Sequence, residues 1–549
     1  MFNRRWWLVV GVCLLAAISV LTLPYGLPND IRYEIGAKEV SPYGPAGTFT
    51  HRPLLYRLIT SLMAAVVGLV TSHRTFFEIG IRSETVLLAA AASVLLWAGL
   101  RRYWSAGAVA VAVAVFGAQV LMDPAFTLEP EWLATTLTVA GVGAALAFRR
   151  TWAGSAAGGI LLASATAVKI ISLPIALIGL IAILVLDRRR ALGATIAAAV
   201  SGGLFLVGLA LLFPREITWL FDIQTVQPLV PSLGTEIGRM ATYLVNVVVM
   251  WPVLALLPAG LLATRWQFKV AVAAALVLGW LPAQIQQHFY IYHAAPLPVV
   301  GAAVIGAAAA RRLDRVEAIA LIVISVWTGV LLSLPRSLRV PYAPVWFGLT
   351  LAIGAVAWWW RRRRLAVAPA APDGVAGVPG DVADVGPQRW YAGLLTGGLV
   401  AITMVGVSLP MSAESLSLPA SSSRNEHVRD AAAGHDVRDA KRIHRRIGTT
   451  TPVTYLTFGD IAYFLKNPAT CRYPSPVFLQ RDSVQHDQEG TKSWHEAELC
   501  LTQPGRWLVW DTGWFRLAGQ PPAIVEAIRH NFNCKRGFRA GKLEVCPHR

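Results

Sequence analysis

The sequence has 549 residues, of which 55% are hydrophobic and only 15% are charged. Soluble globular domains carry roughly a quarter charged residues, so this composition excludes an ordinary soluble protein. The net charge of +18 would suit a nucleic-acid-binding protein, but the basic residues are spread along the chain rather than gathered in one segment, so we expect no nucleic-acid partner.

Thirteen apolar stretches recur along the chain, most of them bounded by charged residues or by Pro and Gly. A helix of roughly 17–25 apolar residues can cross the ~30 Å hydrocarbon layer of a membrane. We therefore predict a mainly α fold, a polytopic membrane helix bundle. The predicted spans are 7–23, 84–100, 106–122, 132–148, 154–168, 170–186, 191–213, 238–262, 267–283, 291–311, 316–334, 343–360 and 390–409.

Basic residues indicate the orientation of these spans. Nineteen Arg and Lys residues flank one side of the membrane, whereas the short loops on the other side carry four, Arg215, Arg239, Arg336 and Arg339. Because loops rich in Arg and Lys face the cytoplasm, we expect a cytoplasmic N-terminus. Because the number of predicted spans is odd, the C-terminus then lies on the opposite, outer side. No small-x-small cleavage site follows the first apolar stretch, so we expect it to remain as a span.

The region 24–83 is the first and largest outer loop in this topology. Its segment 54–70 is apolar, but counting it as a span would reverse every later loop, so we interpret it as a helix in the membrane interface. Asp30 and Glu34 lie one helical turn apart near the start of the loop. A carboxylate at the membrane surface can act as a general base; alternatively, Asp30 is a helix N-cap and Glu34 a solvated neighbour.

The next acidic residues, Asp123, Glu129 and Glu131, occupy the short outer loop between the third and fourth spans. Acidic side chains beside the hydrocarbon are costly unless exposed or paired. This loop is therefore either simply solvated or meets the first loop over one pocket. Lys169 stands between the short fifth and sixth spans, where its ammonium either reaches the lipid headgroups or faces an anionic phosphate.

Histidine and tyrosine residues cluster at the outer end of the tenth span, namely His288, Tyr290, Tyr292 and His293. Interfacial tyrosines commonly form an aromatic belt, whereas the added histidines favour hydrogen bonding to a lipid phosphate or a sugar. No third ligand stands at metal spacing, so we expect no zinc site.

The chain changes character after the twelfth predicted span. Residues 361–388 predict a cytoplasmic linker, because four arginines lead into an Ala/Pro/Gly-rich segment. After the last span, residues 411–549 predict an extracytoplasmic α/β domain, partly helical along 427–446. Within it we expect strands at 452–459, 475–482, 506–515 and 541–548, and helices at 460–467 and 522–532. This leaves residues 1–410 as the membrane domain.

Four of the five cysteines, Cys471, Cys500, Cys534 and Cys546, lie in this C-terminal domain. An even set of cysteines in an oxidising exterior predicts two disulfides, with all three pairings open. Scattered small core residues are the alternative.

Residues 1–410 resemble the GT-C glycosyltransferases, multi-span enzymes that use polyprenyl-phosphate-linked sugars. The motifs that carry the resemblance are the D-x-x-Y-x-x-G-A pattern of Asp30, Tyr33, Gly36 and Ala37, the F-x-x-x-P of Phe49 to Pro53, the acidic second loop, the break at Lys169 and the run H-F-Y-x-Y-H-x-x-P-x-P ending at Pro298. The first of these motifs is most similar to the polyprenol-phosphate-mannose-dependent mannosyltransferase branch.

This resemblance implies an inverting transferase that moves a hexosyl or pentosyl group from a polyprenyl phosphate to a cell-envelope glycan or glycolipid at the outer face of the membrane. Asp30 would be the catalytic base. The departing phosphate would be held by Lys169, His288 and His293 with Arg52 or Arg57. The implied substrate-binding set also includes Glu34, Asp123, Glu129 and Tyr292.

The first loop departs from the commoner family pattern, which has adjacent acids, because Asn29 precedes Asp30. A single carboxylate with Glu34 is a poor divalent-cation site, so no metal is assigned and no cofactor is firmly implied. The expected partners are the lipid-linked sugar donor, the glycan or glycolipid acceptor and membrane lipid. The C-terminal domain would bind the acceptor or cover the mouth of the site.

Two other classes share this topology. A transporter also has many helices and a charged residue at a broken span, but carriers usually lack a disulfide-bearing C-terminal domain, and no repeat relates the two halves of this chain. A non-catalytic envelope-polysaccharide assembly protein or a ligase would not need Asp30.

Overall fold

The computed structural model describes residues 26–549 except for 122–125, 224–225, 229–232, 263, 287–288, 312–314, 335–337, 339–340, 368–425, 458–459, 477, 480–483, 487–489 and 503–506. The chain divides into two compact units. The first, here called the helical unit, comprises Arg82–Gly203 and Leu233–Val428 together with Met1–Gly26. The second, here called the mixed unit, comprises Leu27–Ile81, Leu204–Ser232 and Arg429–Arg549.

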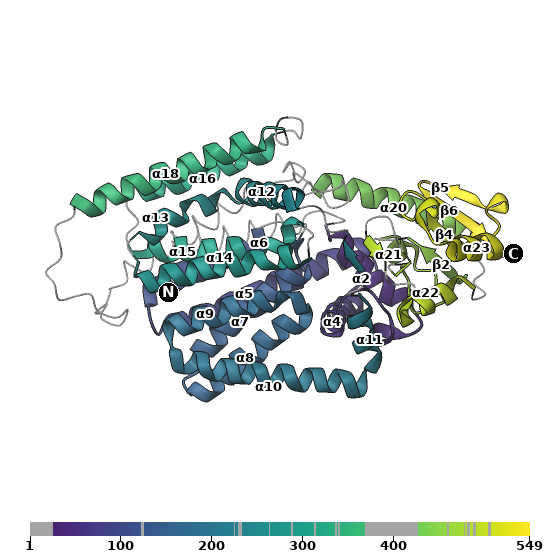
Figure 1. The fold of residues 1–549 in the computed structure, drawn as a ribbon, viewed down its shortest axis with the longest axis horizontal. Coiled ribbons are helices and arrows are strands. Elements are labelled where there is room, and N and C mark those ends of the chain that lie inside the picture. The colour runs from purple at the N-terminus through teal and green to yellow at the C-terminus, as the bar shows by residue number, and fades with distance from the viewer. Residues whose placement is uncertain are drawn as a thin grey trace. The chain divides into compact units, whose positions relative to one another are not determined.

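The helical unit is built from long apolar helices (Figure 1). Their bounds are α5 Arg74–Leu100, α6 Ser105–Leu121, α7 Pro130–Ala147, α8 Thr151–Val168, α9 Leu173–Leu186, α10 Arg188–Leu212, α12 Leu233–Met250, α13 Leu257–Leu261, α14 Trp266–Gln286, α15 Pro296–Arg311, α16 Arg315–Ser333 and α18 Ala343–Val367. Helix α7 contacts α8 and α9 and is buried along almost its whole length, so it is a central helix of the unit.

Six of the helices within the described residues are long and apolar enough to cross a membrane, and the bent pair Gly234–Met250 and Pro252–Leu261 could supply a seventh span. The protein is therefore a helical membrane protein. Eleven of the thirteen predicted spans coincide with helices, whereas 7–23 and 390–409 lie outside the described residues. The total number of spans remains a prediction.

The predicted span 238–262 is not one continuous helix, which corrects the sequence-based expectation. The chain bends by 91° between the two halves. Trp251 leaves the helical region with φ −127° and ψ 72°, and Pro252 follows it. The proline ring lacks an N–H and disfavours helical geometry at the residue before it.

The mixed unit contains a four-stranded sheet in the order β2-β4-β6-β5 (Figure 1). Strand β2 (Val453–Leu456) is parallel to β4 (Trp507–Asp511), and β6 (Leu543–Pro547) is antiparallel to both β4 and β5 (Phe538–Ala540). A separate pair joins β1 (Val226–Pro228) and β3 (Val484–His486).

Helices of the mixed unit come from three separate parts of the chain. They are α2 Asn29–Val40, α3 Gly44–Gly47, α4 Leu54–Val70, α11 Pro214–Asp222, α20 Glu426–Ile447, α21 Ile461–Leu465, α22 Lys492–Thr502 and α23 Pro522–Asn531. The predicted strand at 475–482 is wrong for its described part, because Pro476 and Leu479 form a hydrogen-bonded turn there. Proline cannot donate to a strand ladder, which disfavours a strand at this position.

The four C-terminal cysteines form two disulfides, as predicted, and the structure resolves their pairing as Cys471–Cys500 and Cys534–Cys546. The predicted first outer loop shares hydrophobic cores with this domain. Val40 packs with Tyr455, Ile461 and other residues of the C-terminal segment, and Phe49 packs in a second core with Trp219 and Tyr473. The loop and the C-terminal segment thus fold as one body.

Candidate active site

Asp30 lies in the first turn of α2, near the start of the mixed unit. The helix begins at Asn29 with Pro28 as its N-cap residue, so Asp30 is not the N-cap. Its Oδ2 accepts a hydrogen bond from Arg52 Nη2 at 2.9 Å. Its side chain is 25% exposed, so the carboxylate remains accessible while a guanidinium holds it in one orientation.

The segment that supplies Arg52 has an unusual backbone. His51 adopts a φ of 55°, in the left-handed region that few residues other than glycine occupy. Its ring stacks on Tyr33, with the two centroids 5.5 Å apart. Burial raises the pKa of Tyr33, so the phenol stays protonated. This turn holds Arg52 beside Asp30.

Glu34 and Arg57, both expected to bind substrate, have buried partners within the mixed unit. Glu34 is 1% exposed and pairs with Lys38 at 3.4 Å, and burial lowers the pKa of Lys38 to about 8. Arg57 is fully buried, pairs with Glu216 and donates to the carbonyl of Pro45 at 2.7 Å. The Arg57 side chain thus joins α4 to α3 and α11, and Lys38 Nζ joins α2 to α4 by donating to the Arg57 carbonyl at 3.1 Å.

A third buried ionic group involves Arg32, on the same helix as Asp30. Arg32 donates to both oxygens of Glu78, at 2.8 and 3.1 Å, and to Asp460 Oδ2 at 3.2 Å. Asp460 precedes α21 in the C-terminal segment. Sequence reasoning did not select these three residues, because they lie 46 and 428 positions apart and no local motif joins them.

Lys169 and His293 meet a common acid in the helical unit. Glu131 Oε1 lies 2.6 Å from Lys169 Nζ and 2.6 Å from His293 Nδ1, and Gln286 Nε2 lies 3.4 Å from the same oxygen. Lys169 interrupts the helix between α8 and a 3₁₀ turn, Ile170–Ser172. The sequence pointed to the lysine and the histidine and placed Glu131 in an acidic loop that is either solvated or part of a pocket; the structure buries Glu131 fully.

Two other predicted site residues in the described part of the chain, Glu129 and Tyr292, are close neighbours of this group along the sequence. Glu129 is buried and is the N-cap residue of α7. Tyr292 stacks on Tyr290 with ring centroids 5.5 Å apart, and its ring lies edge-on to that of His293 with centroids 4.3 Å apart. Asp123 and His288 lie outside the described residues.

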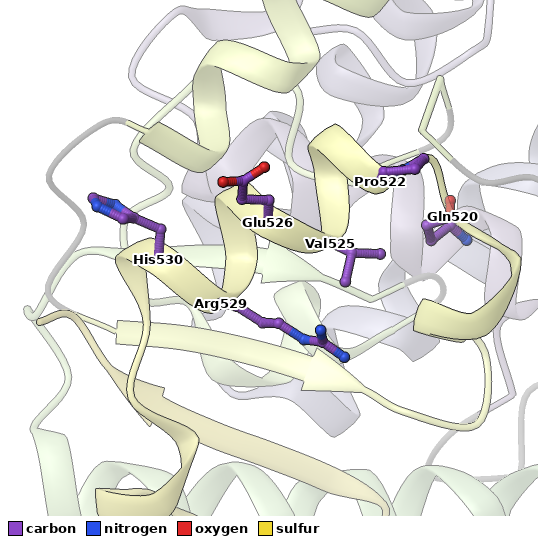
Figure 2. A pocket seen from close by; sticks show the side chains of 6 residues that line it. All are labelled: Gln520, Pro522, Val525, Glu526, Arg529 and His530. Atoms are coloured by element: carbon purple, nitrogen blue, oxygen red, sulfur yellow. The ribbon is translucent and has the colours of Figure 1, made fainter.

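The mixed unit also carries an open pocket of about 630 Å³ along α23. Figure 2 shows its lining side chains, which are Gln520, Pro522, Val525, Glu526, Arg529 and His530. None of these lining side chains is a Phe, Tyr or Trp that could stack on a sugar. Among the described residues, one group of potential metal ligands comes close together, Cys534, Glu544 and Cys546. Its two cysteines form a disulfide, so it does not supply a metal site.

No family model matches the chain, and no curated protein matches it significantly. Among solved structures, apo ArnT from Cupriavidus metallidurans aligns over 98% of this chain and 97% of its own, with a TM-score of 0.55 and 14% identity. The arabinosyltransferase EmbB from Mycobacterium smegmatis aligns over 79% of this chain and 43% of its own, with 15% identity and a TM-score of 0.40 that is too low to establish a common fold. ArnT is a GT-C glycosyltransferase. The chain therefore has the fold of the GT-C class of membrane glycosyltransferases.

Proposed function

We propose that the protein is an inverting glycosyltransferase that takes a sugar from a polyprenyl-phosphate donor and uses Asp30 as its general base. The acceptor would be a cell-envelope glycan or glycolipid at the outer face of the cytoplasmic membrane. The GT-C fold supports the reaction class. The observation that carries the choice of base is the partial exposure of the Asp30 carboxylate.

A general base must reach the proton that it removes. Glu34 and Glu78 are 1% and 0% exposed, and both are paired with buried cations. Glu39, at the other end of α2, is exposed but accepts hydrogen bonds from Arg74 on both of its oxygens. Asp30 uses one oxygen for Arg52, and its Oδ1 accepts no hydrogen bond from any residue that the structure describes. Asp30 is therefore the best candidate on this helix.

In the proposed reaction the Asp30 carboxylate removes the proton of the acceptor hydroxyl. The acceptor oxygen forms a bond to the anomeric carbon while the bond from that carbon to the phosphate oxygen breaks, so the polyprenyl phosphate departs with the electron pair and the configuration inverts. Arg52 would keep the carboxylate oriented toward the acceptor.

Lys169 and His293 remain the proposed contacts for the departing phosphate, together with His288. A lysine ammonium carries three N–H donors, so its bond to Glu131 does not by itself preclude a bond to phosphate. Charge-assisted donors aimed at an oxyanion stabilise the negative charge that develops in the transition state.

The direct test incubates the purified protein with polyprenyl phosphates that carry mannose, arabinose, glucose or galactose, together with an envelope-glycan acceptor, and measures released polyprenyl phosphate and elongated acceptor. We expect Asp30→Asn to be folded and to reduce transfer at least about 100-fold, in the range for loss of acid–base catalysis. The matched control is Glu39→Gln, the same chemical change on the same helix, which should retain transfer.

Undiminished turnover by Asp30→Asn would reject Asp30 as the base. A protein that releases no polyprenyl phosphate from any of the four donors, while transporting a solute across proteoliposomes, would instead be a carrier.

A further inference from the structure

Arg32 stands two residues after Asp30 on α2. Each residue turns an α-helix by about 100°, so these two side chains project from nearly opposite faces. Asp30 is partly exposed, whereas the Arg32 side chain is 3% exposed. The buried face of the helix thus holds a cation directly behind the proposed base.

The guanidinium of Arg32 is bound from two directions. Its Nε and Nη2 donate to the two oxygens of Glu78, and its Nη1 donates to Asp460. Glu78 also accepts the backbone N–H of Leu27 at 3.0 Å, just before the helix starts. Arg32 therefore ties the beginning of α2 both to α5 and to the C-terminal segment.

A buried ionic group of this kind is better suited to fixing geometry than to adding stability. Moving charges out of water costs several kcal/mol per ion and offsets much of the attraction. The fork of an arginine, however, makes two parallel bonds to one carboxylate and fixes direction as well as distance. Because Glu78 and Asp460 bind the same guanidinium from two directions, they fix how α2 is rotated about its own axis.

The Asp460 side chain binds Arg32 in place of capping its own helix. Asp460 occupies the N-cap position of α21, yet its side chain makes no capping hydrogen bond in the described part of the chain. Its carboxylate turns to Arg32 instead. The two helices also approach closely, because a Cβ atom added at Gly36 would lie 2.4 Å from the backbone nitrogen of Tyr463. Helix α2 is therefore seated directly on α21.

From these contacts we propose that Arg32 is a positioning residue, and that the C-terminal domain orients the Asp30 carboxylate through the Asp460–Arg32 ion pair. The domain would then be part of the catalytic apparatus rather than a separate accessory module. This inference rests on the proposed role of Asp30.

The experiment compares Asp460→Asn and Arg32→Gln with the parent protein in the same polyprenyl-phosphate release assay. Misplacing a catalytic group by about 1 Å can cost on the order of 100-fold in rate. We therefore expect kcat to fall by about 10- to 100-fold with KM changed by less than about 3-fold. Glu498→Gln, a partly exposed acid on α22 of the same domain, is the matched control and should keep the parent kcat.

Two further variants separate positioning from general damage. Arg32→Lys keeps the charge but not the fork, so it should restore only part of the kcat lost in Arg32→Gln. The double variant Arg32→Gln/Asp460→Asn should lose little more kcat than the worse single variant, because both changes remove the same Arg32–Asp460 ion pair. If Arg32→Gln is not recovered as a folded protein, Arg32→Lys with Asp460→Asn decides the question in its place.

Parent-like kcat in folded Asp460→Asn and Arg32→Lys would overturn the positioning role, as would fully multiplicative losses in the double variant. Asp30→Asn is measured in parallel. If it is inactive while the Arg32 and Asp460 variants work normally, only this inference fails, whereas an active Asp30→Asn rejects the proposed function itself.

Discussion

Acidic side chains gather at one edge of the four-stranded sheet in the mixed unit. Asp511 ends β4 and Asp460 follows β2, and these two strands are parallel, so their carboxyl ends meet at the same edge. Asp436 on α20 joins them, and Lys542 lies 3.7 Å from Asp436 and 3.4 Å from Asp511. Burial, and then the neighbouring Asp460, raises the pKa of Asp436 to about 8.

The Asp436 pKa gives a prediction for stability. Its folded-state pKa lies above the ordinary value of 3.8, so the folded protein binds the proton more tightly than the unfolded chain does. The stabilisation of the folded protein by protonated Asp436 is therefore fully present below about pH 4 and is lost as the pH rises through about 8. Asp436→Asn, which cannot ionise, should match the parent near pH 4 and have the higher melting temperature near pH 8.

Thermal unfolding of both proteins across this pH range tests the prediction. Glu526→Gln, an exposed acid on α23 of the same unit, serves as the control and should follow the parent at every pH. A constant difference in melting temperature between Asp436→Asn and the parent at every pH would contradict the assignment.

At the level of elements, the close packing of α2 on α21 depends on Gly36. An alanine Cβ would meet the Tyr463 backbone at 2.4 and 2.5 Å, and a backbone cannot move aside as a side-chain end can. We expect Gly36→Ala to destabilise the protein by about 1–3 kcal/mol, the usual range for overpacking. Because α2 carries Asp30, kcat should fall in the same variant.

The matched control is Gly434→Ala in the middle of α20, where the nearest atom to an added Cβ is the side-chain end of Arg438 at 3.6 Å. That change should be neutral or stabilise by roughly 0.5–1 kcal/mol, because alanine loses less backbone entropy in a helix. Denaturant unfolding measures both variants. Equal stability of the two would show that α2 and α21 are not in close contact.

Local patterns predicted the elements well where the signal lay in neighbouring residues. Apolar length identified the helices, and alternating residues identified β2, β4 and β6. The patterns failed where distant contacts decide the structure. The strand predicted at 475–482 gives way to a turn at Pro476, and the partners of Arg57 and Lys169 are acids 159 and 38 residues away. Residue type shows that a buried charge needs a partner, but only the fold shows which one.

For the molecule as a whole, the mixed unit constrains the topology. Residues of 27–81, 204–232 and 429–549 belong to one compact body, so we expect the parts of these segments outside the predicted spans to lie on the same side of the membrane. An even number of spans must therefore separate them. The predicted topology has six spans between the first two segments and twelve between the first and the last. Both predicted numbers are even, as one compact body requires, and the span count and the sidedness stay predictions.

Sidedness itself can be tested with reporter fusions. The two disulfides of the C-terminal domain favour an oxidising exterior. In a bacterial host, alkaline phosphatase fused after Arg549 should therefore be active, and green fluorescent protein at the same position should be dark. Fusions after Arg364, in the predicted cytoplasmic linker, supply the control and should give the opposite pattern. Fluorescence at the C-terminus would move the whole mixed unit, including Asp30, to the cytoplasmic side. The donor would then have to present its sugar at the inner leaflet.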